Sequence, residues 1–431
     1  MAVSPVKIDL SAETAALPQE TFTDVAVVGT ASAAPPNAEF GEVNRYVGSA
    51  AVSEDYGEDS DVHTASQALE AMGAGEWYVL VLEETEYADE DVDDGNAIAN
   101  TPALGEAGVT AAARDVVYSV EDPPPQPDAD EVAINTDTGT VTTDDGTTAT
   151  LTYSTVDWSQ LELLEPQDIN RAHRADVQAN EAHIGEYNEF ISWASGADIG
   201  VPLVIEDISN FADDETGMNT AHAVAGYLPG GNVLGVAHKS TADVGSYILG
   251  QLAINDPWFN PYFDGDGYPF NNGQIEERLI GEPGTAGTFL GGDDNEEGPV
   301  NVVTSISGVN VLWQSVTTAG AASSYQFFDV KMTEIFAASV VENALTSLRL
   351  REDRVPFTSD GRTMIGSTIR GALAEYTGGP DDPFSETEVY IPAIEELTED
   401  DRANRLWTGI TIDGTLSGDA HTFDLELTVS V

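Results

Sequence analysis

The chain contains no cysteine. Disulfide bonds, thiolate metal sites and cysteine nucleophiles are therefore excluded. No apolar run approaches the roughly 18 residues that a membrane-spanning helix needs, so we expect no membrane insertion. Residues 1–10 lack the charged head and the long apolar stretch of a signal peptide, which predicts that the protein is made and folded in the cytoplasm.

Positive charge is also scarce. The 431 residues include 76 acidic and only 15 basic side chains, for a formal net charge of −61, and lysine occurs only at Lys7, Lys239 and Lys331. Nucleic acids and anionic membranes are bound by stripes of lysine and arginine, so we expect neither as a direct partner. Because 41% of the residues are apolar and 8% are aromatic, the chain can still build a core.

An excess of one charge this large destabilises a compact fold through self-repulsion. At molar salt the Debye length falls to roughly 3 Å and the repulsion is screened. The acidity and the shortage of lysine therefore favour a protein from a salt-loving host. The alternative is an acidic protein that works at ordinary salt.

No motif for catalysis or cofactor binding has the spacing that its chemistry requires. Residues 235–240 lack the glycine that precedes lysine in a phosphate-binding loop. Residues 264–267 lack the later ligands of a calcium loop and are more simply an acidic turn. The six histidines form no HExxH motif or close metal pair, and no serine lies in a GxSxG elbow. We expect no catalytic, cofactor-binding or metal site, and a protein that is not an enzyme.

The N-terminal half begins with an α/β pattern. Residues 24–29 and 77–82 are apolar runs typical of buried strands, and residues 60–73 between them repeat apolar side chains at helical spacing. Ser60 or Asp61 is the expected N-cap, and Gly73 the expected end of this helix. Strand, crossover helix and strand predict a parallel unit.

Residues 83–156 change to Asp, Glu, Thr, Gly and Pro, which predicts a β-rich surface insertion with a hairpin turn at residues 144–146. The α/β pattern then returns. We expect a long helix from Asn170 to Ala194, a strand at 201–205 and strands over 302–316 that turn near Gly308.

The last hundred residues have the clearest periodicity. Phe336, Val340, Ala344 and Leu348 share one helix face. A second helix carries apolar residues from Ile365 to Tyr376, and the run of glycines at 378–379 ends it. Strands are expected at 388–391 and 407–416.

Both ends of the chain alternate as edge strands do. The apolar positions of these two arms are Val6, Ile8 and Leu10 at the start, and Phe423, Leu425, Leu427, Val429 and Val431 at the end. A terminal strand can pair within its own sheet or complete the sheet of a neighbouring subunit. The presence of the pattern at both ends favours a protein that polymerises.

Seven of the twelve arginines lie between residues 349 and 405. Five of them form a candidate basic patch: Arg349, Arg351, Arg354, Arg362 and Arg370. Ion pairing with Glu352, Asp353, Asp400 and Asp401 is one interpretation, and docking on an acidic partner is the other. The sequence does not separate them.

The order of these segments resembles the contractile tail sheath proteins of tailed viruses and related injection systems. The resemblance rests on the extended N-terminal arm, the strand 24–31, the helix that ends at 71–75 and the strand 77–82. It also rests on Arg349-Leu350-Arg351, the helix 363–377, Tyr390-Ile391-Pro392, residues 405–410 and the closing alternating strand. Residues 83–156 have no counterpart in it.

This resemblance implies a mixed α/β, multidomain sheath fold. Its parts would be an N-terminal arm (1–20), an outer α/β domain (21–82 and 157–330), the inserted β-rich decoration (83–156), an inner domain (331–418) and a C-terminal strand arm (419–431). It also implies stacked hexameric rings of the protein itself around a tail tube, a baseplate and a tail terminator as neighbours, and a place in the virion tail after assembly in the host cytoplasm. In the family the arms add strands to sheets of neighbouring subunits, and the inner domain faces the tube.

The function expected from the resemblance is a sheath that contracts and drives the tube through the host envelope, in a virus of a halophilic archaeon. The sheath of a cell-encoded injection system is an alternative of the same mechanical kind. A secreted halophilic hydrolase or surface adhesin is an alternative of a different kind, suggested by the aromatic loop at 256–270, which could bind sugar.

Overall fold

The computed structural model contains two compact units. One is Phe22–Phe328, the α/β unit, and the other contains Asp329–Val431, the C-terminal unit. The structure describes residues 24–103, 109–112, 114–119, 122–167, 169–175, 179–205, 224–228, 230–237, 244–259, 300–306, 309–313, 315–319, 323, 326–352 and 355–417. Within these ranges no helix is both long enough and apolar enough to cross a membrane.

Two parallel strands form the centre of the α/β unit, β1 (Val25–Ala31) and β3 (Trp77–Val92). Along β1, Val25 and Val27 pack into one apolar core, while Ala26 and Val28 pack into another. Successive side chains of a strand point to opposite faces, so both faces of this sheet are buried, as parallel strands require. The predicted parallel pairing is confirmed.

The connection from β1 to β3 contains β2 (Asn44–Tyr46), α1 (Ser49–Tyr56) and α2 (Asp61–Ala71). The Ser60 side chain accepts a hydrogen bond from the backbone N–H of His63, which confirms Ser60 as the N-cap. Gly73 follows the helix with φ of 90°, a conformation that favours glycine. Gly29 of β1 lets α2 approach, because a Cβ there would lie 2.7 Å from Val62.

Strand β9 (Arg171–Arg174) pairs with β1 in parallel on the side away from β3. The predicted helix from Asn170 to Ala194 is therefore wrong over its first part, and helix α3 extends only over Ile184–Gly196. All four residues of β9 are buried, although three of them are Arg or His. Its pairing with β1, and not its own polarity, makes this segment a strand.

A second sheet has the order β10, β11, β12, β13. Its strands are β10 (Val201–Ile205), β11 (Val233–Ala237), β12 (Asn301–Ile306) and β13 (Val309–Trp313). Strands β12 and β13 pair antiparallel, as predicted. The N–H of Ala172 in β9 donates to the carbonyl of Gly200 at 2.9 Å, so the two sheets meet along β9 and β10.

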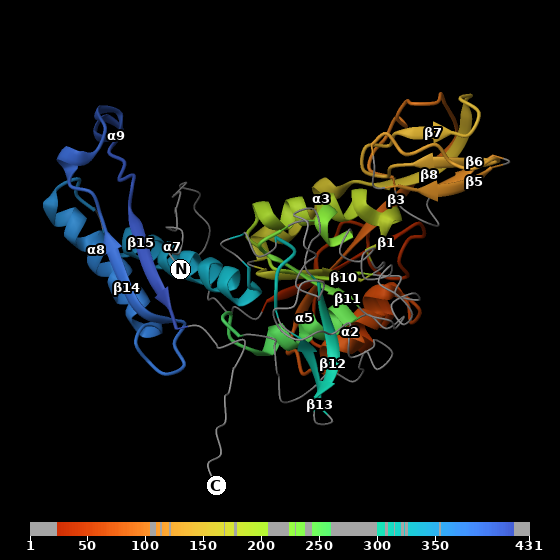
Figure 1. The fold of residues 1–431 in the computed structure, drawn as a ribbon. Helices are drawn as coiled ribbons and strands as arrows, with labels where there is room; N and C mark the ends of the chain where they lie inside the picture. Colours follow the sequence, from red (N-terminus) through yellow and green to blue (C-terminus); the bar gives the residue numbers. More distant parts are fainter. Residues whose placement is uncertain are drawn as a thin grey trace, which may run out of the picture. The chain divides into compact units, whose positions relative to one another are not determined.

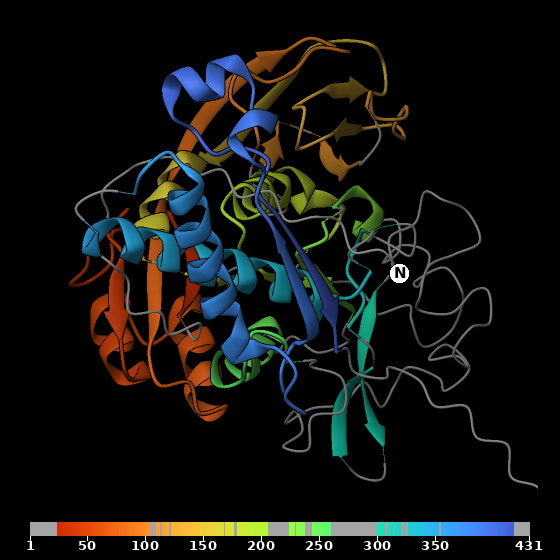
Figure 2. The ribbon, with the colours of Figure 1, turned by 90° about the vertical axis from the view of Figure 1, so that its left-hand side faces the viewer.

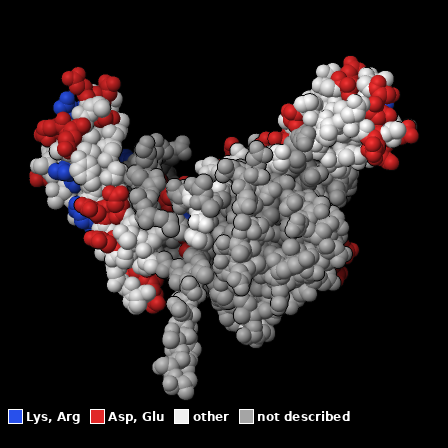
Figure 3. Space-filling view, in the orientation of Figure 1, with Lys and Arg blue, Asp and Glu red and all other residues white. Residues whose placement is uncertain are grey.

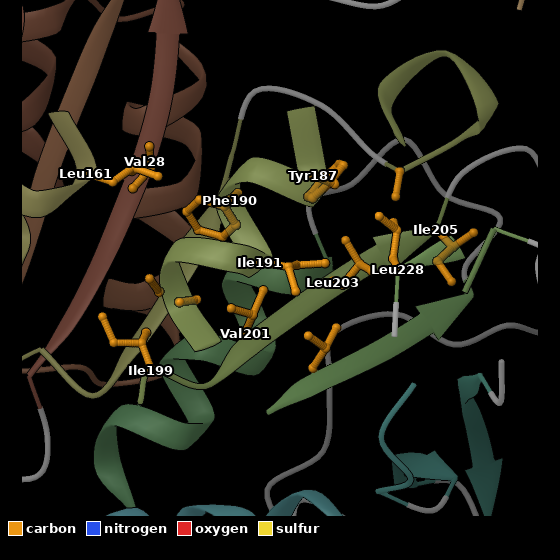
Figure 4. Close-up of a cluster of buried hydrophobic side chains, with 14 of the residues drawn as sticks. Val28, Leu161, Tyr187, Phe190, Ile191, Ile199, Val201, Leu203, Ile205 and Leu228 are labelled. Carbon is orange, nitrogen blue, oxygen red and sulfur yellow. The ribbon is translucent and has the colours of Figure 1, made fainter. Parts of the chain in front are cut away.

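Helices cover both faces of these sheets (Figure 1). Helix α3 lies on one face, where Tyr187, Phe190 and Ile191 pack with Val201 and Leu203 (Figure 4). On the other face, α2 packs closely against α5 (Val244–Ile254), and a Cβ at Gly250 would lie 2.8 Å from the Cβ of Met72.

A buried ion cluster joins β9 to α3. The Arg174 guanidinium pairs with the Glu186 carboxylate, and both side chains are 1% exposed. The other Glu186 oxygen lies 2.8 Å from Nδ1 of His183, and the Arg174 guanidinium lies 5.0 Å and 5.3 Å from the ring centroids of Trp158 and Tyr187. Burial alone lowers the pKa of the neighbouring Arg171 to about 10.

The second half of β3 extends into a small β domain (Figure 1). There β8 (Ala149–Val156) pairs with β3, and β4 (Val109–Ala111) pairs with β8, so that both strands extend the central sheet beyond β3. A separate sheet consists of β5 (Asp115–Tyr118), β6 (Glu131–Ile134) and β7 (Val141–Thr143). Val92, Ile134, Leu151 and Tyr153 belong to its core.

The predicted hairpin turn at 144–146 is wrong, because β7 and β8 on either side of it belong to different sheets. The hairpin is formed by β6 and β7. Its turn begins at Asn135, whose side-chain oxygen accepts from the N–H groups of Asp137 and Thr138 at 3.0 Å. Gly139 completes the turn with φ of 73°.

This turn docks on the start of α3. A Cβ at Gly185 would lie 2.7 Å from backbone atoms of Thr136 and Asp137, so only glycine allows the approach. Burial raises the pKa of the Asp137 carboxyl, opposed by a hydrogen bond from Asn188.

Hydroxyl groups hold many carboxylates of the β domain. Residues 83–156 contain eighteen acidic residues and one basic residue, Arg114. Thr150 donates to Asp91 at 2.5 Å and Thr148 to Asp93 at 2.6 Å. Arg114 contacts Asp144 at 3.1 Å and Asp145 at 3.0 Å. Figure 3 shows the resulting acidic surface of this domain.

The C-terminal unit, in blue in Figure 2, has two helices and two strands as its main elements. They are α7 (Phe328–Arg351), α8 (Ser359–Leu373), β14 (Phe384–Tyr390) and β15 (Thr411–Leu416). Short helices cover Ala374–Tyr376, Ile394–Glu396 and, as α9, Glu399–Asn404. Gly378, just after the short helix Ala374–Tyr376, has φ of 91°. The helical segment therefore ends at the glycines 378–379, as predicted.

We expect Glu186→Gln to lower the free energy of unfolding by about 3–5 kcal/mol, because Arg174 then stays buried without its counter-charge. Urea unfolding at molar salt measures the change. Glu189→Gln, on an exposed part of the same helix, is the matched control and should change the stability little. Equal effects of the two variants would contradict the role given to the pair.

Candidate assembly surface

Strands β14 and β15 form a two-stranded antiparallel sheet on the helices of the C-terminal unit. Its inner face buries Phe384, Val389, Ile391 and Ile412 in one core with residues of α7 and α8, including Val341, Leu345, Ile369 and Leu373. Gly414 lies under the ring of Phe384, where a Cβ would come within 2.8 Å. A sheet of two strands is marginal without such packing.

The hydrogen-bond pattern identifies the groups on the outer edge of β15. The N–H of Ser417 donates to the carbonyl of Pro383 at 2.8 Å, so the next pair, Phe384 and Leu416, is a non-hydrogen-bonded pair of the antiparallel ladder. Because backbone direction alternates along a strand, the N–H and C=O groups of Ile412, Gly414 and Leu416 point away from β14. Within the described residues, none of these groups has a hydrogen-bond partner.

The outer edge of β14 differs, because its own chain covers it. Gly378 donates its N–H to the carbonyl of Phe384 at 2.8 Å. Arg370 donates to the carbonyl of Val389 at 3.2 Å, and Arg362 to that of Ile391 at 2.8 Å. Carbonyls two residues apart point to one edge, so the two guanidiniums cap the same edge. Side chains that cover a strand edge oppose pairing with another chain.

The outward face of the sheet is acidic. Glu386 and Glu388 of β14 and Asp413 of β15 are exposed, and Glu388 lies directly opposite Asp413 in the ladder. Like charges in such a cross-strand pair repel. The repulsion depends on ionic strength because both groups contact solvent.

The structure gives the arginines of the candidate basic patch different roles. Arg362 and Arg370 cap β14. Arg349 and Arg351 are exposed at the end of α7, where positive charge favours the helix dipole, and Arg354 lies outside the described residues. Within the described part of the chain, none of the other four forms an ion pair, so pairing with Glu352, Asp400 or Asp401 is not seen.

A groove of about 610 Å³ lies between α7 and α8. Small residues such as Ala344, Ser347 and Gly371 line it together with Leu350 and Arg351. Leu350 is 62% exposed, so this surface combines an apolar side chain with positive charge at the end of α7.

Several predicted features lie outside the described residues. These are both arms, with Val6, Ile8, Leu10, Phe423, Leu425, Leu427, Val429 and Val431, the acidic turn 264–267, and all of the aromatic loop beyond residue 259. In the described ranges, no group of three or more His, Asp or Glu side chains is arranged to hold a metal ion. The capped edge was missed in the sequence, because a contact from Arg362 to residue 391 leaves no local pattern.

No protein-family model matches the chain. No curated protein matches it either. The chain is similar in structure to a chain of the anti-feeding prophage baseplate, symmetrised six-fold, with a TM-score of 0.54, 12% identity and 100% coverage of both chains.

Two further solved chains come from contracted sheaths. The helical sheath of the anti-feeding prophage matches with a TM-score of 0.53 and 12% identity over 100% of this chain and 96% of that chain. The PVC sheath complex of an extracellular contractile injection system matches with a TM-score of 0.50 and 11% identity over 100% and 99%. This chain therefore has the mixed α/β fold of contractile sheath proteins, as the resemblance predicted.

We expect Glu388→Gln to stabilise the C-terminal unit at low salt, with a rise in the melting midpoint on the order of 1–3 °C, because it removes the like-charge pair with Asp413. At molar salt the difference should vanish. Thermal unfolding across a salt series measures it, and Glu399→Gln on the exposed α9 is the control. A gain that persists at molar salt would contradict the electrostatic cause.

We expect Arg362→Ala with Arg370→Ala to expose the outer edge of β14 and to promote edge-to-edge aggregation of purified subunits. Light scattering and binding of an amyloid dye measure this at fixed protein concentration. Arg402→Ala removes an exposed arginine of α9 and serves as the control. If the double variant aggregates no faster than the control, the two arginines do not protect the edge.

Proposed function

We propose that the protein is a structural subunit of a contractile sheath that polymerises around a tail tube and contracts to drive the tube through a host envelope. The observation that carries the proposal is the edge of β15, which is open among the described residues, in a sheet to which these residues contribute two strands, in a chain with the sheath fold over its full length. Alternating segments at both ends of the same sequence supply strands that fit such an edge.

The proposed role is mechanical and not enzymatic. Each subunit donates its arms, 1–20 and 419–431, to neighbouring copies in stacked hexameric rings. The backbone bonds of the added strands keep subunits tethered while the polar surfaces between them rearrange from the extended to the contracted packing. Sheet completion and contraction then use different contacts of the same subunit.

The second partner in the proposal is the tube protein. The end of α7 supports a docking surface there, since Arg349 and Arg351 are exposed without an ion pair among the described residues, beside the groove that Leu350 lines. Arg354 extends this group in sequence. In a chain of net charge −61, exposed arginines of this kind would favour an acidic tube surface. The baseplate and the tail terminator are the further neighbours in this proposal.

We propose the tail of a virus of a halophilic archaeon as the setting, with assembly in the host cytoplasm. The acidity supports a host with high internal salt. The sheath of a cell-encoded injection system is the second candidate, because the similar solved chains come from the anti-feeding prophage and from an extracellular contractile injection system. Capsid and terminase genes beside the coding sequence would favour the virus.

Purified protein at molar salt should form long hollow tubes in negative-stain electron micrographs. Deletion of residues 420–431 should abolish the tubes and leave a folded subunit, because one donated strand is lost. Circular dichroism checks the fold of the truncated chain. A wild-type protein that stays monomeric across the salt series would refute the proposal, and tubes formed by the truncated chain would refute the part that depends on the C-terminal arm.

A further inference from the structure

The β domain is joined to the rest of the α/β unit by a ribbon of two strands. Its chain enters along the second half of β3 and leaves along β8, and these strands pair antiparallel between Glu84 and Val92 of β3. A domain on one such ribbon keeps a fixed angle to the central sheet only if the ribbon is stiff or a second contact holds the domain.

The ladder of this ribbon is interrupted by a β-bulge. Pairing stops after Tyr87 and resumes at Glu90, so that two residues of β3 lie opposite Thr152 of β8. A bulge of this kind bends a strand and disrupts the ladder locally. Asp89 in the bulge has φ of 56°, and its N–H donates to the Thr152 hydroxyl at 3.1 Å. Tyr153 donates to Glu90 across the bulge, which keeps the two strands together when the ribbon bends.

The second contact is the turn of residues 135–139 on α3, which we call the docking turn. A Cβ at Gly185 would lie 2.7 Å from backbone atoms of Thr136 and Asp137, so the turn lies directly on the helix backbone. The N–H of Gly185 donates to the Thr136 hydroxyl at 3.5 Å, and Asn188 forms a hydrogen bond with the Asp137 carboxylate. These contacts are few and use no cation.

Charge opposes the docking. The β domain has eighteen acidic residues and one basic residue, and α3 contains Glu186 and Glu189 but no basic residue. Arg174 pairs with the buried Glu186, whereas Glu189 is exposed. The Debye length is roughly 3 Å at 1 M salt and roughly 30 Å at 0.01 M. The repulsion between the domain and the rest of the unit therefore grows as salt is removed, while the short contacts of the docking turn change little.

We infer that the β domain is a hinged module that bends at the bulge around Asp89, is held on α3 by the docking turn at molar salt, and is released at low salt. The domain has an apolar core of its own, which includes Val92, Ile134, Leu151 and Tyr153, so it moves as one body. Both positions are available to a single chain, and the movement therefore does not depend on the proposed sheath. In a sheath, it would redirect the acidic surface of every subunit.

The absence of cysteine allows two spin labels at chosen positions of the full-length chain. Ala129→Cys in the β domain and Ala71→Cys at the end of α2 are exposed sites. Pulsed electron resonance at molar salt, below the concentration of assembly, should give one narrow distance distribution. Gly185→Ala should widen it several-fold, because the added methyl group displaces the docking turn. Gly196→Ala in the same helix is the matched control, since a Cβ there meets nothing within 4 Å.

Removal of salt should widen the distribution of the labelled chain without a loss of circular dichroism. Hydrogen exchange of the wild-type chain locates the movement. The amides of Gly185 and Asp89 should exchange several-fold faster at low salt, while the amide of Ile134 in the domain core stays protected. Asp137→Cys with Asn188→Cys, oxidised at molar salt, ties the docking turn to α3 and should keep both amides slow at low salt.

Each part of the inference has an outcome that overturns it. Equally narrow distributions for Gly185→Ala and Gly196→Ala, or a cysteine pair that does not oxidise at molar salt, would contradict the docking turn. A distribution unchanged by salt would contradict the release. Loss of protection at Ile134 together with Gly185 would mean that the domain unfolds and does not swing. Fast exchange at Asp89 in the tied chain would contradict the hinge.

Discussion

Scarcity of positive charge is the constraint on which the rest of the structure depends. The chain has 15 basic residues against 76 acidic ones. A guanidinium therefore stabilises the fold most where its partner is buried, because water and salt cations cannot take its place there. Arg174 pairs with Glu186 in the core, and Arg171 reaches the carbonyl of Leu252 at 2.9 Å while fully buried. Arg362 and Arg370 bind backbone carbonyls at a sheet edge. In each case the guanidinium binds a carboxylate or a backbone carbonyl that cations from the solvent reach poorly.

Surface carboxylates are stabilised in another way, by neutral donors. In the β domain Thr148 donates a hydrogen bond to Asp93 and Thr150 to Asp91. The pKa of the Asp145 carboxyl is lowered first by the hydrogen bond from the Thr147 hydroxyl and second by the one from Arg114. A hydroxyl bond fixes a carboxylate without adding a cation, and salt then screens the charges from one another. The domain therefore keeps its fold with one arginine among eighteen acids.

The sequence predicts elements whose burial matches their own periodicity, such as β1, β3, α2 and α8. It fails at β9, because Arg171, His173 and Arg174 give no apolar strand pattern and the pairing with β1 comes from distant residues. It also misplaces the hairpin of the β domain, where Asn135 forms a better turn than the acidic residues at 144–146. Of the candidate assembly surface, the sequence predicts the strands through their alternation. It does not predict that Arg362 and Arg370 cover the edge of β14, because these contacts depend on how α8 packs on the sheet. The two arms remain predictions.

At the molar salt of the proposed setting, screening would decide which contacts can tether the moving subunits of the proposed sheath. Screening over roughly 3 Å weakens every exposed ion pair, whereas backbone hydrogen bonds of an added strand are short and partly buried, so salt affects them little. The open edge of β15 offers that kind of contact through Ile412, Gly414 and Leu416. The acidic face around Glu386, Glu388 and Asp413 responds to salt instead. A sheath built from this chain would therefore hold its subunits through the strand edge and adjust the spacing between them through the charged face.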